Sequence, residues 1–193
     1  MGRGRNGEGL VRPGEIPAGL PADPARPRAR DDAAGALRRP GFLTGESLKG
    51  ALAERVEVRR LLDWYLVKFY DEVTGYLVTE KIYKRFMTPE QGGGPPDMHG
   101  IRAARNNVRY HLRYIGYLIA TRNWLAGDQL TYADLAAAAH LSAADYLGDV
   151  PWDENETARN WYARVKSRPS FRALLSDRVP GMAAAGHYAD LDF

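Results

Sequence analysis

The segment LTYADLAAAAHLSAADYLGDVPW, residues 130–152, contains the residues that decide the fold. Asp134 stands at the head of a small, apolar run that Gly148 and Pro151 close. With Thr131 as the N-cap, its hydroxyl accepts a hydrogen bond from the Asp134 backbone N–H, and the Asp134 carboxylate accepts one from the Thr131 N–H. The negative charge also suits the positive end of the helix dipole. The segment therefore predicts a capped, buried helix.

Two leucines flank this cap. Leu130 precedes it and Leu135 is the fourth helical residue, which is the spacing of a hydrophobic staple. Acids at helix starts are far more often caps than catalytic groups, so we interpret Asp134 as a folding residue. The predicted structural capping residues are Leu130, Thr131, Asp134 and Leu135.

Apolar side chains also recur three or four residues apart upstream of this helix, which is typical of amphipathic helices. They predict one long helix from about residue 50, with Leu61, Tyr65 and Phe69 on its apolar side, and a second after the turn-forming loop TPEQGGGPPD at residues 88–97. No segment has the alternation of a β-strand. We therefore expect an all-α bundle of about five helices over residues 48–193.

The beginning of the chain has a different composition. Residues 1–50 hold 10 of the 20 glycines and 6 of the 12 prolines, with no apolar period. Such a segment buries too little apolar surface to offset its ordering entropy, so we expect residues 1–47 to be a disordered, Gly/Pro/Arg-rich lead segment. Residues 51–193 carry 18 basic and 18 acidic residues, and this zero net charge argues against nucleic acid as a partner.

Other classes of function are also disfavoured. The chain has no cysteine, and no apolar run approaches the roughly 20 residues that span a bilayer, so we expect no membrane partner and a cytoplasmic protein. The four histidines show no metal-binding spacing such as i, i+4 on one helix, so we expect no metal.

Several segments resemble one known family. WLAGDQLTYADLAAAAHLSAADYLGD (residues 124–149) is similar to the C-terminal helical domain of cytosolic glutathione S-transferases of the bacterial type, whose W-L-x-G-D-x-[LF]-[ST]-x-A-D pattern runs here without departure from Trp124 to Asp134. ERVEVRRLLDWYLVKF (residues 54–69), NWYARVKSRPSFRALLSDRVPG (residues 160–181) and HYADLDF (residues 187–193) resemble other parts of that domain in the same order. The resemblance covers about residues 50–193.

The resemblance implies a function. The family transfers the glutathione thiolate to a small hydrophobic electrophile, so glutathione is the implied co-substrate and a homodimer or self-association is expected. In the family, the thiol-activating Tyr, Ser or Cys lies in an N-terminal thioredoxin-like domain. The pattern of such a domain cannot be identified in residues 1–47. A frame error, a mis-set start and a genuine tail all fit that segment. We therefore assign no catalytic and no glutathione-binding residue, and activity of this chain alone is uncertain.

The resemblance also implies a substrate pocket floored by the first helix of the domain. On this sequence that suggests Tyr65, Phe69 and Tyr162, although aromatic residues at such positions more often fill a core. The alternative function is of another class: a non-catalytic helical module of this family, used for dimerisation or for docking a partner.

Overall fold

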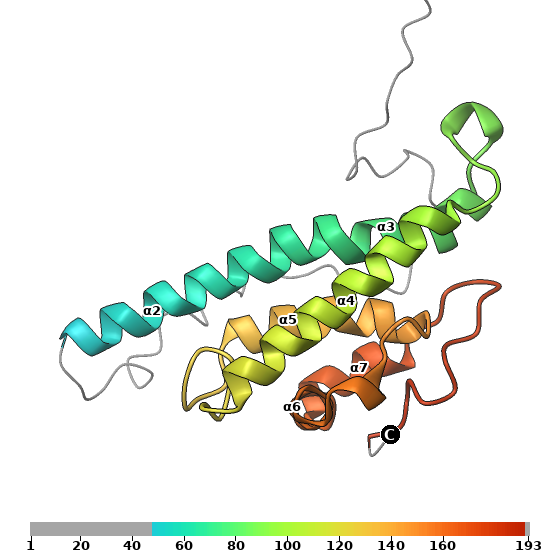
Figure 1. Cartoon of the computed structure of the whole chain (residues 1–193). Helices are drawn as coiled ribbons and strands as arrows, with labels where there is room; N and C mark the ends of the chain where they lie inside the picture. The colour runs from blue at the N-terminus through green and yellow to red at the C-terminus, as the bar shows by residue number, and fades with distance from the viewer. Residues whose placement is uncertain (1–47, 192–193) are drawn as a thin grey trace, which may run out of the picture. The chain divides into compact units, whose positions relative to one another are not determined.

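The computed structural model describes residues 48–191, with side chains from Ala53 onward (Figure 1). The expected disordered lead segment, residues 1–47, lies outside the described residues. The chain divides into Met1–Arg55 and Val56–Phe193, and the second unit holds nearly all of the described structure.

The first long helix consists of three consecutive segments: α2 (Leu48–Asp63), η2 (Trp64–Thr74) and α3 (Gly75–Lys81). They follow one another without a break (Figure 1). The middle segment is a π-helix, in which each N–H bonds five residues back rather than four, and it ends where the Gly75 N–H bonds to the Tyr70 carbonyl.

The π segment keeps one row of apolar side chains facing the core. Every fourth residue in this row is fully buried: Leu61, Tyr65, Phe69, Val73 and Leu77. In an ordinary α-helix each step of four residues turns about 40° beyond a full circle, so the row would rotate away from the core within a few turns. The wider π turn rotates the row the other way. The two helix types together keep all five side chains on the same side.

The connection to the next helix contains two short 3-10 turns, η3 (Tyr83–Arg85) and η4 (Pro89–Gln91). Helix α4 (Met98–Ile119) then begins at Asp97, whose carboxylate accepts a hydrogen bond from the His99 N–H at 2.9 Å. Its buried residues recur with the predicted spacing, from Ile101 through Ile115. One face of α4 therefore packs on the bundle and the other remains in solvent.

Helix α5 (Tyr132–Tyr146) is the central element of the bundle. It packs against η2, α3 and α6. Small buried residues, among them Ala133, Ala137 and Ala138, leave room for these neighbours. Both hydrogen bonds of the Thr131–Asp134 capping box are present at its start.

The C-terminal part contains the short turn η5 (Trp152–Glu154) and helices α6 (Glu156–Lys166) and α7 (Pro169–Ser176). Asn155 caps α6 by accepting a hydrogen bond from the Ala158 N–H at 2.9 Å. The same side chain lies against α4 at Gly116, where an added Cβ would be 2.6 Å from the Asn155 amide nitrogen. Glycine at this position therefore allows α4 and α6 to approach.

Residues 48–191 thus form a bundle of five helices when the continuous 48–81 helix is counted once, and they contain no β-strand, only isolated bridges. The predicted all-α bundle of about five helices is confirmed. Among these described residues, no helix combines the length and the apolar character needed to cross a bilayer.

Candidate functional site

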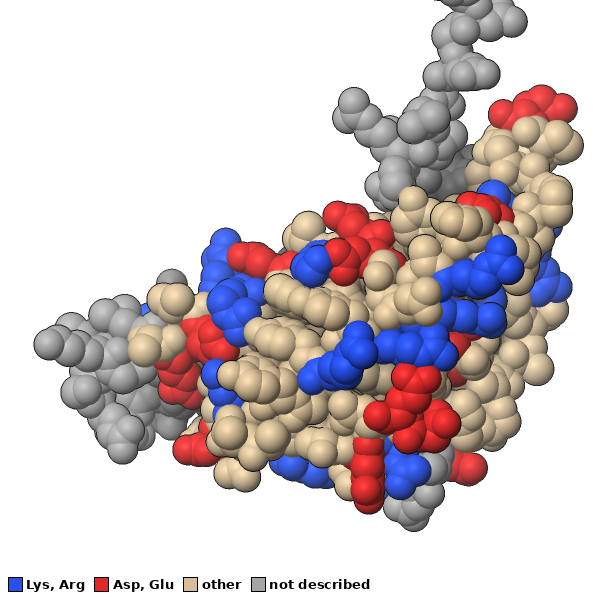
Figure 2. All heavy atoms as spheres, in the orientation of Figure 1, with Lys and Arg blue, Asp and Glu red and all other residues tan. Residues whose placement is uncertain are grey.

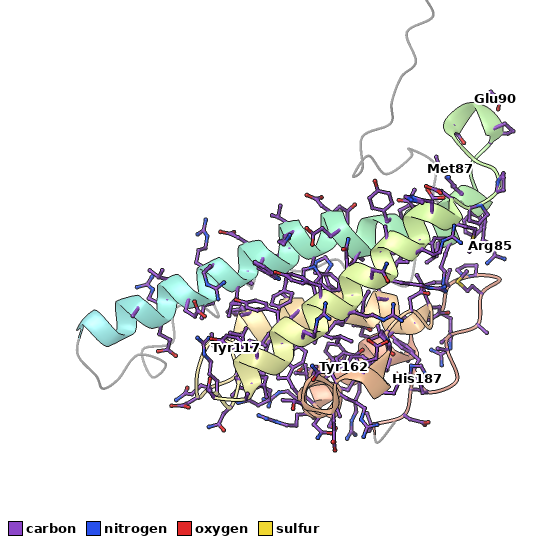
Figure 3. The ribbon with its side chains drawn as sticks, in the orientation of Figure 1. Arg85, Met87, Glu90, Tyr117, Tyr162 and His187 are labelled. Atoms are coloured by element: carbon purple, nitrogen blue, oxygen red, sulfur yellow. The ribbon has the colours of Figure 1, made fainter. Side chains whose placement is uncertain are left out.

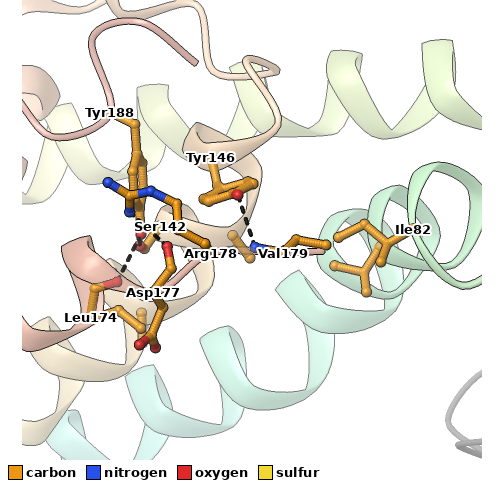
Figure 4. A pocket seen from close by; sticks show the side chains of 11 residues that line it. Ile82, Ser142, Tyr146, Leu174, Asp177, Arg178, Val179 and Tyr188 are labelled. Carbon is orange, nitrogen blue, oxygen red and sulfur yellow. Dashed lines mark hydrogen bonds between the residues drawn. The ribbon is translucent and has the colours of Figure 1, made fainter. Parts of the chain in front are cut away.

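A small cavity opens at the end of α3, beside α5, α7 and the C-terminal segment, residues 177–191 (Figure 4). Its volume is about 210 Å³. The residues that line it are Val78, Ile82, Ala139, Ser142, Ala143, Tyr146, Leu174, Asp177, Arg178, Val179 and Tyr188. Ligand pockets for drug-sized molecules are usually larger, about 300–1,000 Å³, so this cavity suits only a small apolar molecule.

The polar atoms around the cavity mostly bond to one another. The Ser142 hydroxyl lies 2.8 Å from the Tyr188 hydroxyl. The Tyr146 hydroxyl accepts from the Val179 N–H at 3.0 Å and donates to the Met182 carbonyl at 2.8 Å. These bonds tie the C-terminal segment to α5 and shape the cavity wall (Figure 4). They favour a structural role for these hydroxyls over recognition of a polar ligand.

Asp145, three residues after Ser142 on α5, is a completely buried acid. Its carboxylate accepts hydrogen bonds from Trp152 Nε1 at 2.7 Å and from His187 Nε2 at 2.8 Å. The Tyr162 hydroxyl donates to it at 3.3 Å, and the buried Lys166 ammonium lies 3.9 Å away. Burial lowers the pKa of Lys166, and the neighbouring Asp145 charge opposes that effect. This cluster joins α5, α6 and the C-terminal segment.

Asp134 forms a second buried cluster around the capping box. Its carboxylate accepts from the backbone N–H groups of Thr131 and Leu125, each at 2.9 Å. Trp161 Nε1 on α6 donates to it at 2.9 Å. Leu130 and Leu135, the two leucines that flank the cap, are partly buried and pack against the core. Asp134 therefore connects the start of α5 to the preceding loop and to α6.

A partly buried polar network joins the first long helix to α4. Trp64 Nε1 donates to His111 Nδ1 at 3.1 Å, so the other ring nitrogen of a neutral His111 carries the proton and donates to Glu72 at 3.0 Å. Glu72 also pairs with Lys68. Burial lowers the pKa of His111, although the Glu72 carboxylate opposes this shift. The arrangement favours a neutral histidine that fastens two helices.

The three residues suggested for a substrate pocket are all fully buried. The Tyr65 and Phe69 rings are neighbours, with centroids 6.2 Å apart. Tyr162 lies on α6 (Figure 3). Its ring stacks on the Trp152 ring, with centroids 4.7 Å apart. None of the three lines the cavity described above. Burial raises the pKa of both tyrosines well above its usual value.

No pattern in the sequence distinguishes the residues that form this cavity. Ser142 and Tyr146 are four apart on α5, which places them on one helix face, but Leu174 and Tyr188 come from distant parts of the chain. No local pattern indicates that these elements meet. Within residues 48–191, no group of three or more His, Cys, Asp or Glu side chains is arranged to hold a metal ion.

The fold and the two buried clusters define an all-helical domain whose central helix starts with a capping box that contains the buried Asp134. The family profile "Glutathione S-transferase, C-terminal domain" matches residues 98–178. The crystal structure of a glutathione S-transferase from Sinorhizobium meliloti is 48% identical, with a TM-score of 0.74, over 84% of this chain and 69% of that chain. This chain therefore belongs to the glutathione S-transferase family.

Two further relatives are close in sequence. A glutathione S-transferase structure from Rhodospirillum rubrum is 54% identical, with a TM-score of 0.70, over 78% of this chain and 64% of that chain. FtsZ-localized protein A of Caulobacter vibrioides is 52% identical over 141 residues, which are 73% of this chain. The chain matches 60% of the length of that protein.

Proposed function

We propose that this chain is a non-catalytic docking module of the glutathione S-transferase family that associates with FtsZ. The observation that carries the proposal is the 52% identity over 141 residues to a protein named for its localisation with FtsZ. The matched length covers most of the helical bundle. In this proposal residues 1–47 are a lead segment and residues 48–193 are the functional domain.

The chemistry of the helical domain supports docking. Its buried carboxylates, Asp134 and Asp145, each accept several hydrogen bonds from the protein itself. Carboxylates whose hydrogen bonds come from the protein itself stabilise a fold, whereas a catalytic acid must be able to reach a substrate. The cavity beside α5 is small and has mainly apolar walls. Recognition by the outer surface is therefore the function that these features favour.

Co-sedimentation with assembled FtsZ from the same organism tests this proposal. The full chain is expected to pellet with FtsZ polymers and to remain in the supernatant without them. FtsZ-localized protein A with its own FtsZ serves as the positive control. Recovery of this chain in the supernatant, while the control pellets, would contradict the proposal.

Glutathione transfer is the second candidate, and the two solved structures described as glutathione S-transferases, at 48% and 54% identity, favour it. Glutathione would be the co-substrate and a small hydrophobic electrophile the acceptor, with Tyr65, Phe69 and Tyr162 as the pocket. Retention on glutathione resin and turnover of a chlorinated nitroaromatic test this candidate. Absence of both from a folded chain would exclude it.

A homodimer in the cytoplasm belongs to the same proposal. Exposed apolar residues on the first long helix, including Leu66 at 52% and Val67 at 57% exposure, support self-association. Sedimentation equilibrium is expected to give twice the chain mass. A monomer at high concentration would contradict this part of the proposal and leave FtsZ association to be judged by co-sedimentation.

A further inference from the structure

The outer face of α4 differs in chemistry from the rest of the domain. This 22-residue helix contains four arginines and neither Asp nor Glu. Arg102, Tyr110, Arg113 and Tyr117 lie on its solvent side and are all exposed, and we call them the arginine–tyrosine face. Lys and Arg atoms gather along the course of α4 in the space-filling view (Figure 2).

The arginines of α4 fall into two groups. Arg105 pairs with Asp149 at 2.7 Å, and Arg109 pairs with Glu154 at 2.7 Å. Arg102 and Arg113 make no ion pair within the described part of the chain. Among the described residues, the two arginines of the arginine–tyrosine face are therefore not neutralised by an ion pair, although residues 51–193 as a whole have zero net charge.

Exposed aromatic rings accompany these charges. Tyr117 is 73% exposed and Tyr110 is 49% exposed. Tyr117 projects near the end of α4 in the stick view (Figure 3). Tyrosine and arginine are the residue types enriched at protein interfaces, because both offer a large contact area together with specific hydrogen bonds. A face that carries both, without internal partners for its arginines, has the composition of an interface.

We infer that the arginine–tyrosine face docks an acidic segment of a partner protein, in which Asp or Glu residues are interspersed with apolar ones. This inference rests on the proposed docking function, and it names the surface of the domain that would bind the partner. Guanidinium groups bind carboxylates through two parallel hydrogen bonds, and the tyrosine rings supply the apolar contact between them. Arg102 and Tyr117 are 15 positions apart, which is about 22 Å along the helix axis and the length of roughly seven extended residues.

Other occupants fit this surface less well. Nucleic-acid binding rests on several phosphate contacts at once, and only two arginines on this face lack ion pairs. A symmetric pairing of the face with its own copy would place two positive surfaces against each other. Both alternatives give distinct results in the experiment below.

The test uses the full chain and a fluorescein-labelled peptide of Glu, Asp, Leu and Tyr residues, with a Lys-substituted peptide as the charge control. Arg102→Glu/Arg113→Glu is expected to weaken binding of the acidic peptide at least tenfold. The matched variant, Arg168→Glu/Arg172→Glu, changes the net charge equally at two exposed arginines elsewhere and should stay within twofold of the wild type. Tyr110→Ala/Tyr117→Ala should also weaken binding. Thermal melts check that each variant is folded.

Several results would overturn the inference. One is an equal loss of affinity for the acidic peptide in both charge-reversal variants. Another is that the wild-type chain binds the Lys-substituted peptide as tightly as the acidic one. A third is that the wild-type chain does not bind the acidic peptide at millimolar concentration. Tighter binding of an oligonucleotide would assign the face to nucleic acid, and a shift of the monomer–dimer equilibrium in Arg102→Glu/Arg113→Glu would assign it to a second copy.

If the peptide binds and FtsZ does not, the proposed function fails while this inference stands. If FtsZ binds the Arg102→Glu/Arg113→Glu variant normally, only the inference fails.

Discussion

Charged side chains are buried and hydrogen-bonded at the interface between α5 and α6. On the outer face of α4 they are exposed, and two of them are unpaired among the described residues. Asp134 and Asp145 are completely buried, and each accepts a hydrogen bond from an indole N–H and further bonds from its surroundings. Arg102 and Arg113 are exposed and have no ion pair among the described residues. A buried charge is costly unless its hydrogen bonds are complete, whereas an exposed cation costs little. The comparison teaches that the buried acids hold the fold together, while the exposed arginines remain available to a partner.

The largest expected effect is at Asp134. Asp134→Ala removes the acceptor of the Thr131 N–H in the capping box of α5. It also leaves the Leu125 N–H and Trp161 Nε1, both in the interior, without their acceptor. We expect a loss of about 3–5 kcal/mol in the free energy of unfolding, measured by urea denaturation. Asp134→Asn keeps one acceptor oxygen, so its free energy of unfolding should fall by less than that of Asp134→Ala.

Asp128→Ala is the control for this change, because Asp128 is exposed in the loop before α5. It should alter the free energy of unfolding by less than about 0.5 kcal/mol. A small effect of Asp134→Ala, similar to that of Asp128→Ala, would show that the buried acid does not stabilise the bundle.

A second prediction compares the loss of stability at a buried and at an exposed valine of the π segment. Val73 is fully buried in the apolar row, whereas Val67 is 57% exposed on the same segment. Val73→Ala should cost about 2 kcal/mol through lost burial and a residual cavity, and Val67→Ala should stay within about 0.5 kcal/mol. Equal losses in urea denaturation would mean that the π-helical register is wrong.

The third prediction concerns pH. Burial lowers the pKa of His111 and of His140, so the folded protein keeps both rings neutral where the unfolded chain binds protons. The free energy of unfolding should therefore be highest above about pH 6.5, the ordinary histidine value, and fall as the pH drops below it. His111→Gln should flatten this dependence between pH 7.5 and 5. An unchanged slope would contradict the neutral, buried His111.

These elements differ in how well the sequence predicts them. The capping residues and the five helices could be predicted because capping and amphipathic spacing are local patterns. The π segment could not, since an apolar residue at every fourth position fits an α-helix nearly as well over a few turns. Nor could the Asp145 cluster or the cavity, because His187 and Tyr188 reach α5 only through the packing of the C-terminal segment. The apolar spacing predicts that Tyr65 and Phe69 face inward, whereas their complete burial depends on contacts from other helices.

The smallest expected effect on stability is at the arginine–tyrosine face. Arg113→Gln should change the free energy of unfolding by less than about 0.5 kcal/mol, because the side chain is exposed and has no ion pair among the described residues. Arg105→Gln is the informative partner to this variant, because Arg105 pairs with the buried Asp149. A larger loss in Arg113→Gln than in Arg105→Gln would mean that Arg113 is structural.

The most direct test of the docking function is co-sedimentation of Arg102→Glu/Arg113→Glu with assembled FtsZ, combined with urea denaturation of the same sample. We predict that the variant keeps the stability of the wild type and loses at least nine-tenths of its FtsZ-bound fraction. The Arg168→Glu/Arg172→Glu control should keep both the wild-type stability and the wild-type FtsZ-bound fraction. Wild-type binding by the charge-reversed face, or no binding by the wild type itself, would contradict the account.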